Sequence, residues 1–99
     1  NMSRMFENCS TITSLDLSSF DGSSLSSIPR DMFSGCSNLT TIYATSAFDL
    51  SGDNTGTTMF YGCSKLVGGN GTTWNQNAVG NGYARIDGGS GAPGYFTQK

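Results

Sequence analysis

Three cysteines at a constant interval constrain this chain more than any other feature of its sequence. Cys9, Cys36 and Cys63 lie 27 residues apart, and each belongs to the motif Met-Phe-x-(Gly/Asn)-Cys-Ser-x-(Leu/Ile). The three copies of the motif are residues 5–12, 32–39 and 59–66. A fixed period of this length indicates a repeat protein, in which each copy forms one coil of a stacked solenoid.

The residues that follow the first two cysteines have the spacing of a leucine-rich repeat. Segments 12–17 and 39–44 both match the pattern L-x-x-L-x-L, with Ile or Ala at some positions. The end of each segment predicts a short strand with alternating side chains, and successive strands would pair in parallel. The inward positions would be Leu15, Leu17, Ile42 and Ala44. The outward positions would be Ser14, Asp16, Thr41 and Tyr43.

The residues that precede each cysteine predict the opposite side of the coil. Asn8, Gly35 and Gly62 share one position of the repeat, and Gly and Asn adopt positive φ most easily. We therefore expect a short helical or 3₁₀ turn that ends at this position. The phenylalanines of the motif would fill the coil interior, each against its copy in the next coil. They are Phe6, Phe33 and Phe60.

The repeat also bears on what the cysteines do. Redox activity or metal binding is one interpretation, but the chain has no histidine and no C-x-x-C pair. Identical repeat positions favour a buried ladder of Cys9, Cys36 and Cys63, because free cysteine is among the most buried residue types. A disulfide between adjacent copies stays open. We expect no metal and no cofactor.

The third copy ends differently and divides the chain in two. Val67-Gly68-Gly69 replaces the expected strand, and the residues beyond are unlike the repeats. The predicted fold is α/β, a leucine-rich-repeat-like solenoid of short parallel strands and short helical or 3₁₀ turns over residues 1–67. Residues 68–99 would form a β-rich C-terminal cap over the apolar end. Within it we expect a strand at 83–87, a turn at 88–91 and a second strand at 94–97 pairing with the first.

Composition excludes several classes of function. The net charge is −2 and charged residues make up 12% of the chain, so there is no basic footprint for nucleic acid or an anionic membrane. No apolar run approaches the roughly 18 residues of a membrane span. Without histidine, the many serines lack the usual base of a hydrolase, so we expect no enzyme. The pattern is already under way at Asn1, which suggests a segment of a longer protein.

Two groups of side chains are candidate sites with simpler explanations. Asp49, Asp53 and Asn54 could bind calcium, but they lack the spacing of a calcium loop, and Asp49 repeats the position of Asp21. An aspartate at such a position more often caps a turn through its own backbone. The cap aromatics could form a platform for a glycan, although packing inside the cap is the simpler role. They are Trp74, Tyr83 and Tyr95.

The outward strand residues form the third candidate. Solenoids commonly bind partners through such a surface, and Ser14, Asp16, Thr41 and Tyr43 would lie on it. Tyr43 is the best single anchor, since aromatic residues are enriched at binding hot spots. The alternative is an ordinary exposed strand face without a partner.

The motifs together resemble one known family. The Met-Phe-x-Gly-Cys-Ser-x-Leu element, the run 15–21, the ending 66–73 and the closing segments 83–89 and 93–97 resemble the BspA-like leucine-rich-repeat surface proteins of bacteria. That resemblance implies a secreted or cell-surface module that binds a host extracellular protein or another cell surface. It brings no catalytic motif. Two other functions stay open: a structural spacer, and a carbohydrate-binding module that uses the cap aromatics.

Overall fold

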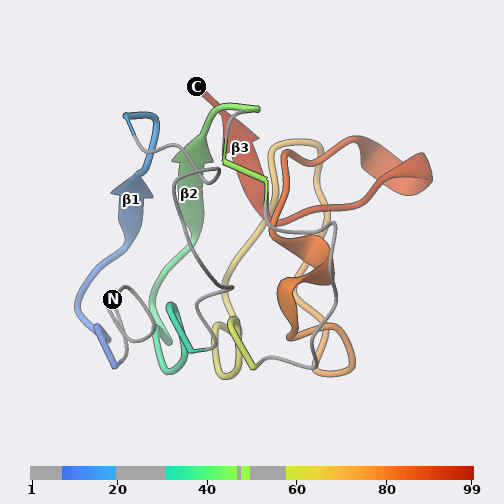
Figure 1. The fold of residues 1–99 in the computed structure, drawn as a ribbon. Helices are drawn as coiled ribbons and strands as arrows, with labels where there is room; N and C mark the ends of the chain where they lie inside the picture. Colours follow the sequence, from blue (N-terminus) through green and yellow to red (C-terminus); the bar gives the residue numbers. More distant parts are fainter. Residues whose placement is uncertain (1–7, 20–30, 47, 50–57) are drawn as a thin grey trace.

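Three short parallel strands form the centre of the fold. The computed structural model describes residues 8–19, 31–46, 48–49 and 58–99. Within them lie strands β1 (Ser14–Asp16), β2 (Thr41–Ala44) and β3 (Phe96–Gln98). They form one sheet in the order β1-β2-β3, and in Figure 1 they lie side by side and point the same way. The strands predicted after the first two cysteines are therefore present.

The register of the sheet follows the period of the sequence. Between β1 and β2, Leu15 pairs with Ile42, a separation of 27 residues, which is also the cysteine spacing. Between β2 and β3, Ile42 pairs with Phe96, a separation of 54 residues or twice the period. β3 thus occupies the place where a strand of the third copy would lie.

Alternation of side chains explains which face of each strand is buried. Ile42 and Ala44 of β2 are fully buried, Tyr43 between them is exposed, and Leu17 just after β1 is buried. Leu15 is half-buried. Branched and aromatic side chains suit such a half-buried pleated surface, so these short segments adopt the extended conformation despite their length.

The segments before the cysteines are turns closed by single i→i+3 hydrogen bonds, as from Cys36 N to Phe33 O and from Cys63 N to Phe60 O, and they do not extend into a continuous helix in the described copies. The physical reason is that the N–H groups alternate, since those of Ser34 and Cys36 bond within the turn and those of Phe33 and Gly35 bond sideways to the neighbouring copy. Phe33 N donates to Met59 O at 3.0 Å, and Gly35 N donates to Tyr61 O at 2.7 Å. Asn8, Gly35 and Gly62 have φ values of 60°, 84° and 81°, so the predicted positive φ at this repeat position is confirmed.

Aromatic rings fill the interior between the sheet and the turns. The Phe33 and Phe60 rings are stacked, with centroids 5.4 Å apart and an interplanar angle of 9°. The Phe96 ring meets the Phe60 ring edge-on at 6.2 Å, and the Tyr95 ring does the same at 4.9 Å. All four side chains are fully buried. Rings from two repeat copies and from the C-terminal segment therefore share one core.

The C-terminal segment differs from its prediction. Instead of a strand at 83–87, it has the 3₁₀ helix η2 (Asn81–Tyr83) and a single bridge from Ile86 to Phe96. A second 3₁₀ helix, η3 (Gly89–Gly91), lies in the predicted turn. The predicted pairing of segments 83–87 and 94–97 is present only as the parallel bridge from Ile86 to Phe96, with hydrogen bonds from Phe96 N to Arg85 O and from Asp87 N to Phe96 O, and β3 pairs with β2 along its other edge. Among the described residues of 68–99, β3 is the only named strand, so this segment is not β-rich.

The chain after Leu66 explains why the edge of β2 is available to β3. Val67 N still donates to Thr40 O, as Thr40 N donates to Thr13 O one period earlier. The chain then folds back, and Val67 forms an antiparallel bridge with Thr73. The glycine-rich stretch between them has low strand propensity, which favours this departure from the sheet.

Some predicted positions lie outside the described residues, namely Phe6, Asp21, Asp53 and Asn54. In the part of the chain that the structure describes, no helix has the length and apolar character needed to cross a membrane.

Candidate functional site

The exposed side of the sheet brings together side chains from all three strands. Asp16 is the register partner of Tyr43, which is the register partner of Thr97. Partners in a parallel sheet point to the same side, so these three residues form one row across the strands. Ser14 and Thr41 form the row before it. We call this surface the outward face, and it consists of Ser14, Asp16, Thr41, Tyr43, Thr97 and Lys99.

Lys99 links the two outer strands across this face. Its main-chain N–H donates to Ala44 O at 3.0 Å, so the backbone continues along β2 just beyond β3. The side chain extends over Tyr43, with Nζ 5.3 Å from the ring centroid. It ends 2.7 Å from Oδ2 of Asp16 on β1. One ammonium group therefore contacts a carboxylate and an aromatic ring that belong to two other strands.

The electrostatics of the face follow from this contact. The Lys99 ammonium, together with hydrogen bonds from Ser18, holds the pKa of Asp16 well below its usual range. The Asp16 carboxylate in turn raises the pKa of Lys99. Both side chains are about half exposed, at 48% for Asp16 and 50% for Lys99. Both groups are therefore charged at neutral pH, and solvent reaches both of them.

The structure places the four predicted face residues together and adds two that the sequence did not suggest. Tyr43 is 36% exposed, Ser14 and Asp16 are exposed, and Thr41 is half-buried. Thr97 and Lys99 complete the face because β3 pairs with β2. The only sequence feature that points to Thr97 and Lys99 is their position, two repeat periods after Tyr43 and Thr45. That signal has meaning only once the third strand is known to come from the C-terminus.

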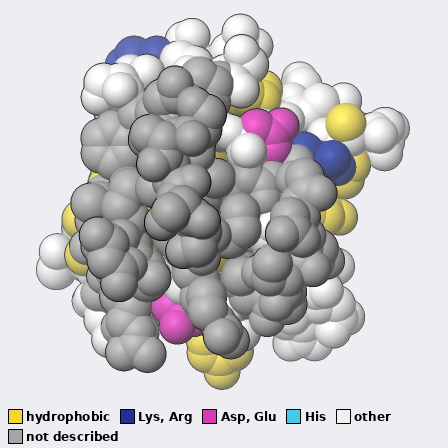
Figure 2. All heavy atoms as spheres, in the orientation of Figure 1, with side chains coloured by type: hydrophobic (Ala, Val, Ile, Leu, Met, Phe, Trp, Pro, Cys, Tyr) yellow, Lys and Arg dark blue, Asp and Glu magenta, His cyan; other side chains and the backbone are white. Residues whose placement is uncertain are grey.

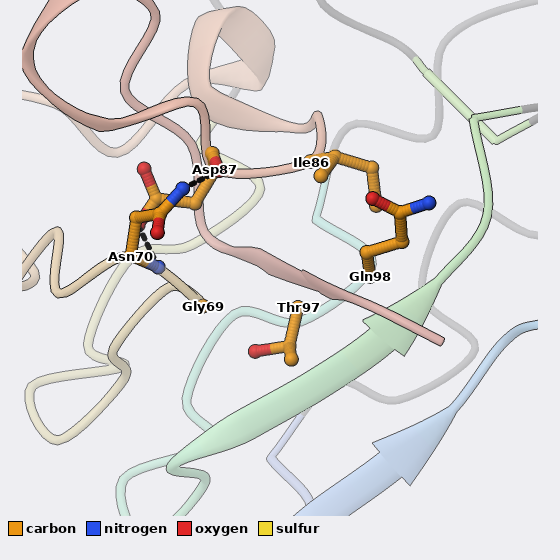
Figure 3. A pocket seen from close by; sticks show the side chains of 6 residues that line it. All are labelled: Gly69, Asn70, Ile86, Asp87, Thr97 and Gln98. Atoms are coloured by element: carbon orange, nitrogen blue, oxygen red, sulfur yellow. Dashed lines mark hydrogen bonds between the residues drawn. The ribbon is translucent and has the colours of Figure 1, made fainter.

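A small cleft lies at the other edge of β3. Its volume is about 250 Å³. Figure 3 shows Thr97 and Gln98 extending to opposite sides of β3, with Asn70 and Asp87 hydrogen-bonded to each other on one side of the cleft. Most of the groups that face it are polar. The lining residues are Gly69, Asn70, Ile86, Asp87, Thr97 and Gln98.

Asp87 is the buried carboxylate beside this cleft. Its Oδ2 accepts hydrogen bonds from the N–H groups of Asn70 and Thr72 at 2.8 and 3.0 Å. Its Oδ1 accepts from the Thr72 hydroxyl at 2.7 Å and from Gly89 N at 2.9 Å. Burial raises the pKa of Asp87, but these hydrogen bonds outweigh it and lower the pKa to about 2. The carboxylate ties segment 70–72 to segment 87–89 and has its acceptor sites filled.

The cysteines are free thiols inside the repeat. Cys36 and Cys63 are buried and Cys9 is half-buried. The Cys63 thiol donates to Phe33 O at 2.9 Å, and its hydrogen bond with Cys36, together with burial, raises the pKa of Cys63. In the described part of the chain, no group of three or more potential ligand side chains could hold a metal.

The cap aromatics do not form a platform of three exposed rings. Tyr95 is fully buried. Its hydroxyl donates a hydrogen bond to Ala78 O at 2.8 Å and accepts one from Asn75 N at 3.1 Å. Trp74 and Tyr83 are half-buried and pack against the core. On the face drawn in Figure 2, the charged side chains of the described residues do not form a patch of one sign.

Comparison with known proteins gives one match. No curated protein and no solved structure matches the chain. Residues 1–90 match the model of a protein family, and this match covers all three copies of the cysteine motif and most of the C-terminal segment. The chain therefore belongs to the family described as Mycoplasma protein of unknown function, DUF285.

Proposed function

We propose that this chain is a non-catalytic protein-binding module that uses the outward face of its sheet. The observation that carries the proposal is the row Asp16–Tyr43–Thr97, in which an exposed tyrosine stands at the centre of a polar surface. Pairing of β2 with both neighbouring strands holds the backbone of this tyrosine in place, and Lys99 lies over its ring. A preordered aromatic side chain with a polar rim is a common binding hot spot.

The proposal also includes the repeat architecture of the chain and its resemblance to the BspA-like surface proteins. We infer a leucine-rich-repeat-like solenoid over residues 1–67 with a capping segment over residues 68–99, as in the BspA-like surface proteins. The 27-residue register of β1 and β2 supports stacked coils, and the side-by-side turns support them too. By that resemblance the module works outside a bacterial cell or on its surface. Its partner is a host extracellular protein or another cell surface, and no nucleic acid is involved.

The test compares an exposed tyrosine of the outward face with an exposed tyrosine of the turns. The 99-residue chain is immobilised and probed with extracellular matrix proteins, mucins and intact cells. We expect Tyr43→Ala to weaken capture about tenfold, because a central aromatic anchor is lost. Tyr61→Ala is the matched control, since Tyr61 is 63% exposed and lies among the turns. If both variants are captured as well as the parent chain, the outward face is not the binding surface.

A structural spacer is the second candidate. The contact between Lys99 and Asp16 favours it, because two charges of the face already satisfy each other. A spacer predicts that Tyr43→Ala and Asp16→Ala leave attachment of whole cells unchanged. Removal of complete 27-residue repeats from the native protein would then change attachment only because the protein becomes shorter. Capture that depends on Tyr43 would exclude this role.

A further inference from the structure

A carboxylate and an aromatic ring on the outward face both contact the ammonium group of Lys99. Asp16 Oδ2 lies 2.7 Å from Lys99 Nζ, and the centroid of the Tyr43 ring lies 5.3 Å from the same atom. A carboxylate supplies a charge-assisted hydrogen bond to an ammonium or guanidinium group, and an aromatic face attracts the same groups through its quadrupole. The two groups together are the usual components of a cation-binding site.

The Asp16 carboxylate and the backbone of Tyr43 are held by contacts that do not involve Lys99. Asp16 Oδ1 accepts a hydrogen bond from Ser18 N at 2.9 Å, which orients the carboxylate and directs Oδ2 toward the cation. Tyr43 is the register partner of Asp16, and its carbonyl accepts from Leu17 N at 2.7 Å. The geometry of the pair therefore comes from β1, β2 and the turn after β1.

The lysine side chain can leave while the backbone stays in place. Lys99 is held in the sheet by its main-chain N–H on Ala44 O, and this bond does not involve Nζ. Its side chain and that of Asp16 are both about half exposed, and ion pairs at such sites are weak because water competes for both charges. A cation from another molecule can replace Nζ at little cost.

We propose that Asp16 and Tyr43 form a recognition site for a lysine or arginine side chain of a partner protein, and that Lys99 occupies this site until the partner displaces it. The proposal rests on the binding function proposed above and specifies the chemistry of the partner as an exposed basic segment. The charge of the chain is complementary to such a segment, since its net charge is −2. Lys99 then acts as an internal competitor that lowers the affinity for isolated cations and favours partners with several of them.

The test uses a defined basic probe and two matched pairs of variants. A fluorescent octalysine peptide is titrated with the chain at low salt, with octaserine as the neutral control. We expect Lys99→Gln to tighten binding about three- to tenfold, because the competitor is removed. Lys65→Gln removes the same charge at a distant side chain that bonds Asn38, so it reports the effect of net charge alone. Asp16→Asn should weaken binding about tenfold, and Asp49→Asn is its control.

The ring is tested in the same way. Tyr43→Phe keeps the aromatic face and should bind octalysine as the parent chain does, whereas Tyr43→Leu should bind several-fold more weakly. Equal effects of Lys99→Gln and Lys65→Gln, or weaker binding by Lys99→Gln, would overturn the proposal. Capture of a neutral or acidic partner through Tyr43, with no binding of octalysine, would overturn it and leave the proposed binding function intact. If neither octalysine binding nor partner capture depends on Tyr43, both this proposal and the proposed binding function are overturned.

Discussion

The indole N–H of Trp74 donates a hydrogen bond to the main-chain carbonyl of Phe60, with 2.9 Å between Nε1 and O. One period earlier, the Cys63 thiol donates to the carbonyl of Phe33, also at 2.9 Å. The main-chain N–H groups of the two phenylalanines show the same relationship. Phe33 N donates to Met59 O of the next copy, whereas Phe60 N donates to Val79 O of the C-terminal segment. The C-terminal segment thus satisfies, on the last repeat copy, the groups that a following copy would satisfy.

Loss of the indole N–H should therefore destabilise the fold. We expect Trp74→Phe to lower the free energy of unfolding by about 1–2 kcal/mol, since the Phe60 carbonyl loses its donor while an aromatic ring is kept. Urea denaturation followed by circular dichroism measures the change. Tyr61→Phe, at an exposed ring, should shift the value by less than about 0.5 kcal/mol. Equal stability of Trp74→Phe and the parent chain would mean that this hydrogen bond contributes nothing.

The positive φ of the repeat motif gives a second prediction. Gly35 has φ +84°, and a Cβ there would collide with Oδ1 of Asn8 in the neighbouring copy. Gly71 has φ +93°, and a Cβ there would meet nothing within 4 Å. Gly71→Ala should therefore cost only the strain of the left-handed conformation, about 1–2 kcal/mol. Gly35→Ala should cost about 1–2 kcal/mol more, because the contact between copies must also open. Thermal unfolding of both variants checks the difference.

The parts of the fold that could be predicted from the sequence are those that repeat. The period predicted β1 and β2, the alternation of Ile42 and Tyr43, and the positive φ at Asn8 and Gly35. In each case two or three copies in the sequence reported the same local requirement. The predicted turn is limited to single i→i+3 hydrogen bonds because the alternate N–H groups have partners in the neighbouring copy, and one copy alone does not show these partners.

The C-terminal segment has no copy to compare with, so its contacts could not be found in this way. The pairing of β3 with β2 joins residues 54 positions apart, and it depends on the glycine-rich chain after Val67 leaving the sheet. The outward face was therefore only partly predicted. Tyr43 and Asp16 follow from strand alternation, but Lys99 reaches them only through β3.

The Asp87 network predicts a dependence on pH. Asp87 has a pKa of about 2 in the folded chain, below the ordinary value of 3.8. A depressed carboxylate pKa stabilises the folded state above about pH 4, and this contribution is lost as the pH falls toward 2. The difference corresponds to about 2 kcal/mol. Asp87→Asn should lower stability by about that amount at pH 7 and should flatten the acid limb of the stability curve.

The control for this prediction is an exposed carboxylate. Asp49 is exposed and lies outside the Asp87 network, so Asp49→Asn reports the effect of removing one negative charge. Urea denaturation at a series of pH values between 2 and 7 gives both curves. An acid limb that is equally steep in Asp87→Asn and in the parent chain would show that Asp87 does not control it.

The burial of the thiols leads to the last prediction. Cys36 and Cys63 are buried and Cys9 is half-buried, so an aromatic disulfide reagent should modify Cys9 first in the folded protein. The raised pKa of Cys63 further slows its reaction, because the thiolate is the reactive form. We expect one fast phase that is lost in Cys9→Ser, and two slow phases that become fast in urea. Three thiols reacting at the same fast rate in the native protein would contradict the buried positions of Cys36 and Cys63.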